Sequence, residues 1–229
     1  FLLIKIIYRV IGFDIVMQSR IIDILFIFGL MGMVFGSLSA IRESDIRRMI
    51  AFSSVAQMGY IYMGFGLGTE AGMTASVFHI LSHAATKSLL FIAAIGLTDV
   101  SGGSRQFFDL TGAGYRNKMA GVAFPVGALS MVGGPMFSGF VSKLLFAEAA
   151  IGHTYKMLPA VMVLALSTIL NAIYFMKTVL RIYVPEHKAD YEVITAKDEK
   201  EYAVTVACFI LLNIALGMFS QPVQSWIHA

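Results

Sequence analysis

The chain has 229 residues, of which 58% are hydrophobic and 14% are charged, whereas a soluble domain carries about a quarter charged residues. This deficit, together with long apolar runs, excludes an ordinary soluble domain and indicates a polytopic membrane protein. The net charge of +3 does not indicate nucleic-acid binding, because the charges lie between the apolar runs rather than on one amphipathic face.

The first apolar run, residues 1–13, reads FLLIKIIYRVIGF and contains Lys5. It has neither an initiator Met nor the cleavage site of a signal peptide. The run is typical of the middle of a membrane helix, so we expect the chain to be a fragment. From composition alone, Lys5 is interpreted as an anchor at a helix end.

Six further apolar runs follow, and each is long enough for a helix that crosses the hydrocarbon core of a bilayer, which takes about 20 residues. They are 21–41, 49–67, 72–98, 119–150, 157–183 and 202–220. None alternates as the strands of a β-barrel do. We therefore predict an all-α, polytopic membrane helix bundle of about seven transmembrane helices, forming a single membrane domain over residues 1–229.

Lysine and arginine are distributed unevenly between the loops. Of the 17, ten fall in or beside three alternate loops, whereas the opposite loops hold only Arg20 and Lys156. The positive-inside rule therefore places the loops at 42–48, 99–118 and 184–201 in the cytoplasm. We expect a multi-pass protein of the cell (inner) membrane, with 99–118 and 184–201 as its polar cytoplasmic loops.

The run SVFHILSHAATKSLLFIAAIGL carries three ionisable side chains, His79, His83 and Lys87, each four residues from the last. On a helix they form a file along one face, about 12 Å long. Such groups are costly at bilayer depth and indicate a functional site. Histidine titrates near neutral pH, and the file is suited to passing a proton through bound water. A metal site at the two histidines, and histidines that are only structural, stay open as alternatives.

The run 119–150 is interrupted at Gly133, Gly134 and Pro135. A broken membrane helix leaves backbone carbonyls that can hold ions or water. Lys143 follows this helix break and is predicted to be a gated proton site, although a lysine there could also extend to the membrane interface. Glu148 is either its partner, and so a secondary candidate for proton transfer, or a charge at the end of the helix.

Other polar positions predict structure rather than chemistry. Ser53, Ser54 and Gln57 favour hydrogen bonds between helices. Cys208, the single cysteine, excludes an internal disulfide and a cysteine-based metal site, and its apolar surroundings predict a buried side chain. No phosphate-binding loop, dinucleotide fingerprint, nucleophile elbow or haem site is found in the sequence. We therefore predict no catalytic centre, no cofactor and no bound metal in this chain.

Three stretches, in this order and spacing, carry a resemblance to a known family. They are SDIRRMIAFSSVAQMGYI, FHILSHAATKSLLF and GALSMVGGPMFSGFVSKLLF. They resemble the antiporter-like proton-pumping subunits of respiratory complex I, in a superfamily with Mrp-type cation/proton antiporters and the membrane arms of energy-converting hydrogenases. Such subunits have fourteen helices in two inverted repeats. The resemblance implies that this chain corresponds to the second half of such a subunit, without the Glu–Lys pair of the first half.

The resemblance also implies site residues. It places Lys5 at the central lysine, His79, His83 and Lys87 at the connecting relay, and Lys143 at the distal site on the broken helix. The implied function is translocation of protons, or exchange of protons for Na⁺, in a larger complex such as an NADH:quinone oxidoreductase-like or hydrogenase-like translocase. The implied partners are other membrane subunits, the missing first half and the lipid bilayer. The alternative is a structural membrane subunit that anchors a redox enzyme and pumps nothing.

Overall fold

The computed structural model describes residues 6, 10, 12, 15–16, 20–152, 155–185, 193–195 and 199–228. Within these ranges the regular secondary structure is helical, which confirms the all-α prediction, and only two isolated β-bridges occur. The helices are α3 (Ile21–Arg42), α4 (Ile46–Gly66), α5 (Glu70–Asp99), α6 (Ala113–Arg116), α7 (Lys118–Val132), α8 (Ser138–Ile151), α9 (Met157–Ile182), α10 (Lys200–Met218) and α11 (Ser220–His228).

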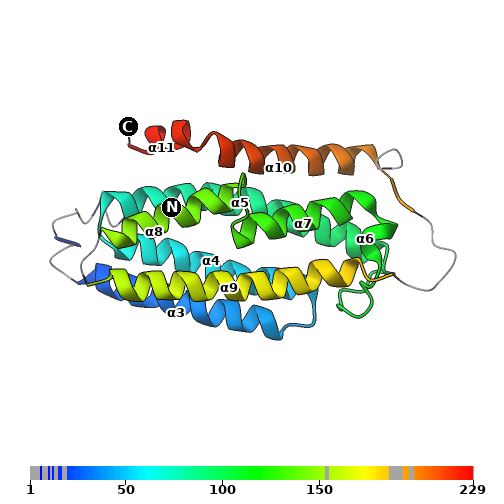
Figure 1. The fold of residues 1–229 in the computed structure, drawn as a ribbon, viewed down its shortest axis with the longest axis horizontal. Coiled ribbons are helices and arrows are strands. Elements are labelled where there is room, and N and C mark those ends of the chain that lie inside the picture. Colours follow the sequence, from blue (N-terminus) through cyan, green and yellow to red (C-terminus); the bar gives the residue numbers. More distant parts are fainter. Residues whose placement is uncertain are drawn as a thin grey trace.

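The long helices run side by side as a bundle, with α3 and α9 along one edge and α10 along the opposite edge (Figure 1). Four of the described helices, α3, α5, α9 and α10, are long and apolar enough to cross a membrane. The interrupted run is divided between α7 and α8, each too short to span the roughly 30 Å hydrocarbon core alone. The predicted bundle with one interrupted helix is thus observed.

Capping residues set where several helices begin. Asp45 accepts hydrogen bonds from the backbone N–H groups of Arg47 and Arg48, at 2.8 and 3.1 Å, at the start of α4. Thr69 and Asn117 cap α5 and α7 in the same way, at 3.1 and 3.0 Å. Aspartate, threonine and asparagine are favoured at this position because their side chains satisfy N–H groups that have no partner inside the helix.

Glycines allow α3 and α4 to approach closely. A Cβ atom at Gly59 would lie 2.6 Å from the carbonyl oxygen of Gly29 and 2.5 Å from the backbone nitrogen of Met33. Such a contact is too short for any side chain, so the two backbones touch at this point. Small residues at helix interfaces are the usual route to close packing in membranes, where the hydrophobic effect does not drive helices together.

The described parts of the three basic segments lie at one end of the bundle. The loop that follows α3 is bound to the segment that follows α5, through Ile46 N–H to Arg105 O at 3.0 Å and Phe107 N–H to Ser44 O at 2.9 Å. Arg181, at the end of α9, donates from Nε to the carbonyl of Phe107 at 3.1 Å. The loops that the positive-inside argument assigned to one side of the membrane therefore lie at the same end of the bundle. That this end faces the cytoplasm stays a prediction.

A buried lysine closes the opposite end of the bundle. Lys156, predicted as a loop residue, is only 5% exposed. Its Nζ lies 2.7 Å from Asp23 Oδ1 on α3 and donates to the carbonyl of Gly66, the last residue of α4, also at 2.7 Å. The ammonium group also lies 5.4 Å from the centre of the Phe26 ring. Lys156 therefore ties the start of α9 to both α3 and α4.

We expect Lys156→Met to destabilise the protein by about 1–3 kcal/mol, because it removes an ion pair and leaves the Gly66 carbonyl without this donor. The loss is limited because the side chain of Asp23 is 40% exposed and its charge is screened by solvent. Thermal unfolding of the detergent-purified protein measures the effect. Lys118→Met, at an exposed lysine at the other end of the bundle, is the matched control. Equal stability of the two variants would contradict the role of Lys156.

The prediction that Cys208 is buried is wrong. Cys208 is exposed on α10, and Val206 and Asn213 are the buried residues of that helix. α10 lies along the edge of the bundle (Figure 1), and several of its large apolar side chains are exposed, namely Val204, Leu211, Leu212 and Met218. In a membrane protein an apolar run does not distinguish burial in the protein from exposure to lipid or to another subunit.

Candidate functional site

Three predicted site residues meet in a small cavity beside the helix break. His79 and His83 reach it from α5 and Lys143 reaches it from α8. Its volume is about 10 Å³, close to the space that a single water molecule occupies by the same measure. The full lining is Gln57, His79, Ser82, His83, Thr86, Ser130, Met131, Gly139 and Lys143. Polar side chains from α4, α5, α7 and α8 thus meet around one small cavity inside an otherwise apolar bundle.

Lys143 turns back toward the break instead of extending to the membrane interface. Its Nζ donates to the carbonyls of Met131 and Val132, at 2.9 and 2.7 Å. These are the last two residues of α7, whose carbonyls lose their helical partners because the helix stops at Gly133, with φ +98°. The break therefore creates the acceptors that hold the lysine.

His79 is oriented by a hydrogen bond and by ring contacts. Its Nδ1 hydrogen-bonds to Ser142 Oγ on α8 at 2.6 Å. The ring stacks between Tyr60 and His83, with centroid distances of 5.5 and 6.0 Å. The Nε2 atoms of His79, His83 and Gln57 are buried and have no hydrogen-bond partner among the described residues. Buried polar atoms without a partner are uncommon and indicate bound water or a functional role.

Lys87 lies one helical turn beyond His83 and does not line the small cavity. It is 6% exposed, and its Nζ donates to the carbonyl of Ile50 at 2.7 Å and to Ser53 Oγ. Ser53, predicted to make hydrogen bonds between helices, is thus a direct partner of Lys87. Within the described ranges, neither Lys87 nor Lys143 forms an ion pair with a carboxylate. Both ammonium groups are held by neutral oxygen atoms.

Polar contacts continue from Lys87 toward α9. The side chain of Ser53 also interacts with the hydroxyl of Tyr174, which donates to Asn171 Oδ1 at 2.5 Å. Ser37 on α3 reaches the same oxygen at 3.5 Å. Sequence reasoning did not identify Asn171 or Tyr174. An amide inside an apolar run was the signal that could have identified Asn171.

Asn213 is a second buried amide that the sequence analysis missed. Its Oδ1 accepts hydrogen bonds from Ser130 on α7 at 2.6 Å and from Ser138 on α8 at 2.8 Å, while its Nδ2 donates to Thr86 on α5 at 3.1 Å. One side chain of α10 therefore joins both halves of the broken helix to α5. Asn213 thus adds a polar contact to the apolar packing of Tyr202, Val206, Phe209 and Ile210 against the core.

We expect Asn213→Leu to lower the free energy of unfolding by about 2 kcal/mol, since three interhelical hydrogen bonds at roughly 0.6 kcal/mol each are lost. Thermal unfolding in detergent and limited proteolysis of the segment before α10 measure the loss. Cys208→Ala, at an exposed residue of the same helix, should unfold as the unsubstituted chain does. An Asn213→Leu variant as stable as this control would show that the amide does not hold α10.

The remaining predicted residues lie elsewhere. Glu148 is exposed and lines a separate cavity of about 310 Å³, together with Glu70 and Gln224, so it is placed as a charge near the end of α8 and not as the partner of Lys143. Lys5 lies outside the described residues. In the described part of the chain, no three histidine, cysteine, aspartate or glutamate side chains gather as metal ligands do.

Comparison with known families and proteins gives a consistent result. Residues 3–172 match the family described as "NADH:quinone oxidoreductase/Mrp antiporter, TM". NADH-quinone oxidoreductase subunit N of Desulforudis audaxviator is 31% identical over 205 residues, which cover 85% of this chain and 40% of that protein. Subunit M of the same enzyme from Rickettsia typhi is 29% identical over 196 residues, covering 85% and 39%.

Solved structures show the same fold. A chain of the Mrp complex from Dietzia sp. superposes with a TM-score of 0.79 at 25% identity, over 94% of this chain and 48% of that one. A chain of the membrane-bound sulfane sulfur reductase, an archaeal respiratory membrane complex, gives a TM-score of 0.80 at 27% identity, over 92% and 42%. The present chain thus spans less than half the length of these proteins.

Proposed function

Because this chain belongs to the NADH:quinone oxidoreductase/Mrp antiporter family of transmembrane proteins, we propose that it translocates protons, or exchanges protons for Na⁺, as one subunit of a larger complex. The family and the apolar helices confirm the predicted multi-pass location in the inner membrane. The partners in this proposal are other membrane subunits and a first half that carries the Glu–Lys pair. The driving force for transport comes from a redox module elsewhere in the complex or from an opposing ion gradient.

The observation that supports the proposal best is the position of Lys143. The ammonium group of this lysine is hydrogen-bonded to the carbonyls that the helix break leaves without helical partners. The same side chain lines a cavity with two histidines. A structural subunit has no need for such an arrangement, because ionisable groups are costly at bilayer depth. Broken helices beside polar cavities are the usual location of ion sites in transporters.

The proposed relay runs in the order Lys87, His83, His79 and Lys143. Lys87 lies within electrostatic range of His83, and His79 lies within range of both His83 and Lys143. The two histidines line a cavity the size of one water molecule, and their Nε2 atoms have no described hydrogen-bond partner, so a water molecule there would carry a proton between them. Each lysine then takes up a proton when its neighbour is neutral and releases it when the neighbour becomes charged, since like charges repel.

The test measures proton and Na⁺ movement in vesicles that contain the complex with this chain. Lys87 and Lys143, the two lysines of the proposed relay, are replaced one at a time. The proposal requires transport to fall while assembly persists. If the chain is instead a structural subunit that only anchors a redox enzyme, transport should be unchanged in every variant. One tightly bound transition metal per chain, found by metal analysis of the purified protein, would favour the alternative of a metal site at His79 and His83.

A further inference from the structure

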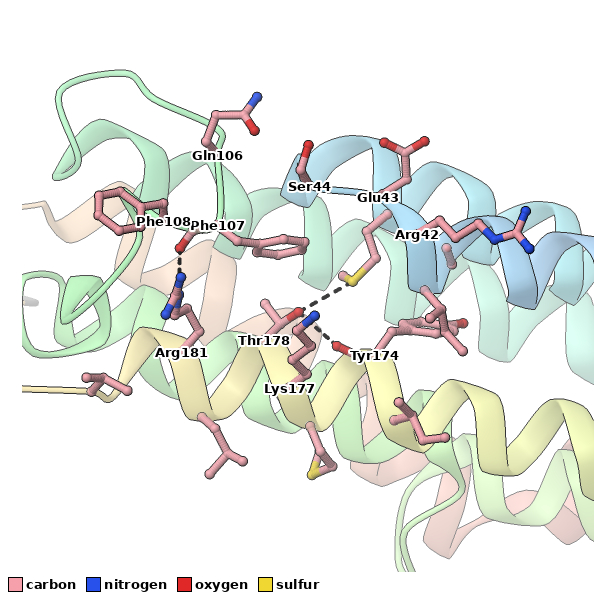
Figure 2. A pocket seen from close by; sticks show the side chains of 17 residues that line it. Arg42, Glu43, Ser44, Gln106, Phe107, Phe108, Tyr174, Lys177, Thr178 and Arg181 are labelled. Atoms are coloured by element: carbon pink, nitrogen blue, oxygen red, sulfur yellow. Dashed lines mark hydrogen bonds between the residues drawn. The ribbon is translucent and has the colours of Figure 1, made fainter.

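A second, larger cavity lies at the basic end of the bundle. It is bounded by the C-terminal ends of α3 and α9 and by the loop residues 106–108 (Figure 2). Its volume is about 860 Å³, within the range of about 300–1,000 Å³ that is typical of small-molecule sites. It shares no lining residue with the cavity around His79, so the proposed relay does not account for it.

The cavity carries an excess of positive charge. Arg42, Lys177 and Arg181 line it, and Glu43 is the one carboxylate among its described lining residues. Glu43 is already paired, at 3.1 Å, with Arg48, which lies outside the lining. The three cations therefore have no carboxylate partner within the described ranges.

Two of the basic side chains face a shared space, whereas the side chain of Arg42 points away from Lys177 and from the loop (Figure 2). Figure 2 shows Lys177 and Arg181 projecting from α9 toward the loop and the end of α3. The Nε of Arg181 is held by the Phe107 carbonyl, which leaves the outer nitrogens of the guanidinium group available. Arginine and lysine together form the usual site for a phosphate group, because they give several charge-assisted hydrogen bonds.

An apolar stripe leads into this charged end. The exposed residues of one face of α9 are spaced by three or four positions and end in a lysine: Met162, Leu166, Ile169, Ile173 and Lys177. Residues at this spacing lie in a row along a helix. Ile173 and Lys177 also line the cavity, so the stripe and the cavity are continuous. From Leu166 to Lys177 the stripe is about 16 Å long, close to half of the roughly 30 Å hydrocarbon core of a bilayer.

We propose that the cavity and the stripe together bind one anionic phospholipid. The phosphodiester lies between Lys177 and Arg181, and an acyl chain lies along the stripe from Ile173 to Leu166. A soluble phosphate would neutralise the cations but leave the stripe uncovered, whereas a lipid matches both. The predicted orientation agrees, because it places this end at the cytoplasmic leaflet, which is rich in anionic lipids. The inference requires a membrane location and does not depend on proton transport.

Native mass spectrometry of the membrane complex that contains this chain tests the proposal. Phosphatidylglycerol and phosphatidylcholine with identical acyl chains are added in turn, and the bound fractions are compared. We expect phosphatidylglycerol to bind preferentially. Each cation contributes about fivefold to the affinity, equivalent to about 1 kcal/mol per basic residue near an anionic headgroup. The variant with both Lys177→Gln and Arg181→Gln should therefore bind phosphatidylglycerol about 25-fold more weakly.

The controls separate the lipid from a free anion. Lys118→Gln removes an exposed lysine of the same end that does not line the cavity, and it should leave binding unchanged. Ile173→Glu should weaken phosphatidylglycerol binding through the stripe. If the double variant does not assemble, Lys177→Gln alone carries the test, with an expected loss of about fivefold.

Three results would overturn the proposal. Equal binding of the two lipids would show that charge does not select the ligand. Unchanged phosphatidylglycerol binding in the double variant would show that the lipid does not bind at this site. Where Lys177→Gln carries the test instead, unchanged binding in that variant would show the same. Binding of inorganic phosphate that excludes phosphatidylglycerol, unaffected by Ile173→Glu, would identify a site for a free anion instead.

Discussion

Replacement of Lys143 by alanine should reduce proton or Na⁺ transport at least about 100-fold, the lower limit of what a positioned proton-transfer group contributes. The ammonium group is the one titratable group held at the helix break by the carbonyls of Met131 and Val132 among the described residues. Removing it leaves the relay from His79 without a group that accepts the proton on α8. Proton uptake by vesicles that contain the complex measures the loss.

Two further variants separate proton transfer from structure. Lys143→Arg keeps a positive charge near the carbonyls, but a guanidinium does not release its proton in proteins, so transport should remain lost while thermal stability recovers. Glu148→Gln, five residues further along α8 at an exposed position, should transport as the unsubstituted chain does. Full transport in Lys143→Arg would show that only the charge matters and would remove Lys143 from the relay.

The boundaries of several helices could be predicted because short-range rules decide them. The run predicted at 157–183 is observed as α9 (Met157–Ile182), and that at 72–98 as α5 (Glu70–Asp99). A run of apolar residues bounded by capping residues leaves little freedom in a membrane, since every backbone group must be bonded inside the segment. α11 was not predicted, because it is short and amphipathic and has no apolar run to mark it.

The site was less predictable because its contacts join distant parts of the chain. The spacing of His79, His83 and Lys87 fixes the face of a helix that they share, but not what lies against that face. That Lys143 bends back to Met131, and that Asn213 joins three helices, depends on how α7, α8 and α10 pack. Lys156 shows the same limit, since a lysine between two apolar runs looks like a solvated charge until a neighbouring carbonyl and carboxylate enclose it.

The lysine farther from the helix break offers an independent test of the proposed route. Lys87→Ala should also lower transport at least about 100-fold, while redox activity of the complex persists and its coupling to transport is lost. Its Nζ donates to Ser53 and Ile50 of α4, and Ser53 in turn contacts Tyr174 of α9. Lys87 is therefore where the histidine file meets the polar groups of α4 and α9, and unlike Lys143 it lies outside the small cavity that His83 lines.

Ser53→Ala is the matched variant for this position, because it removes a neutral partner of Lys87 but keeps the proton-binding group and its bond to Ile50. It should lower transport by less than Lys87→Ala does. A relay predicts this order, since a lysine with one acceptor fewer still exchanges its proton. If the two variants lose transport equally, the hydrogen-bonded contact between α4 and α5 is what matters, and Lys87 is a structural residue. If Lys87→Ala transports fully, the route from His83 must bypass it.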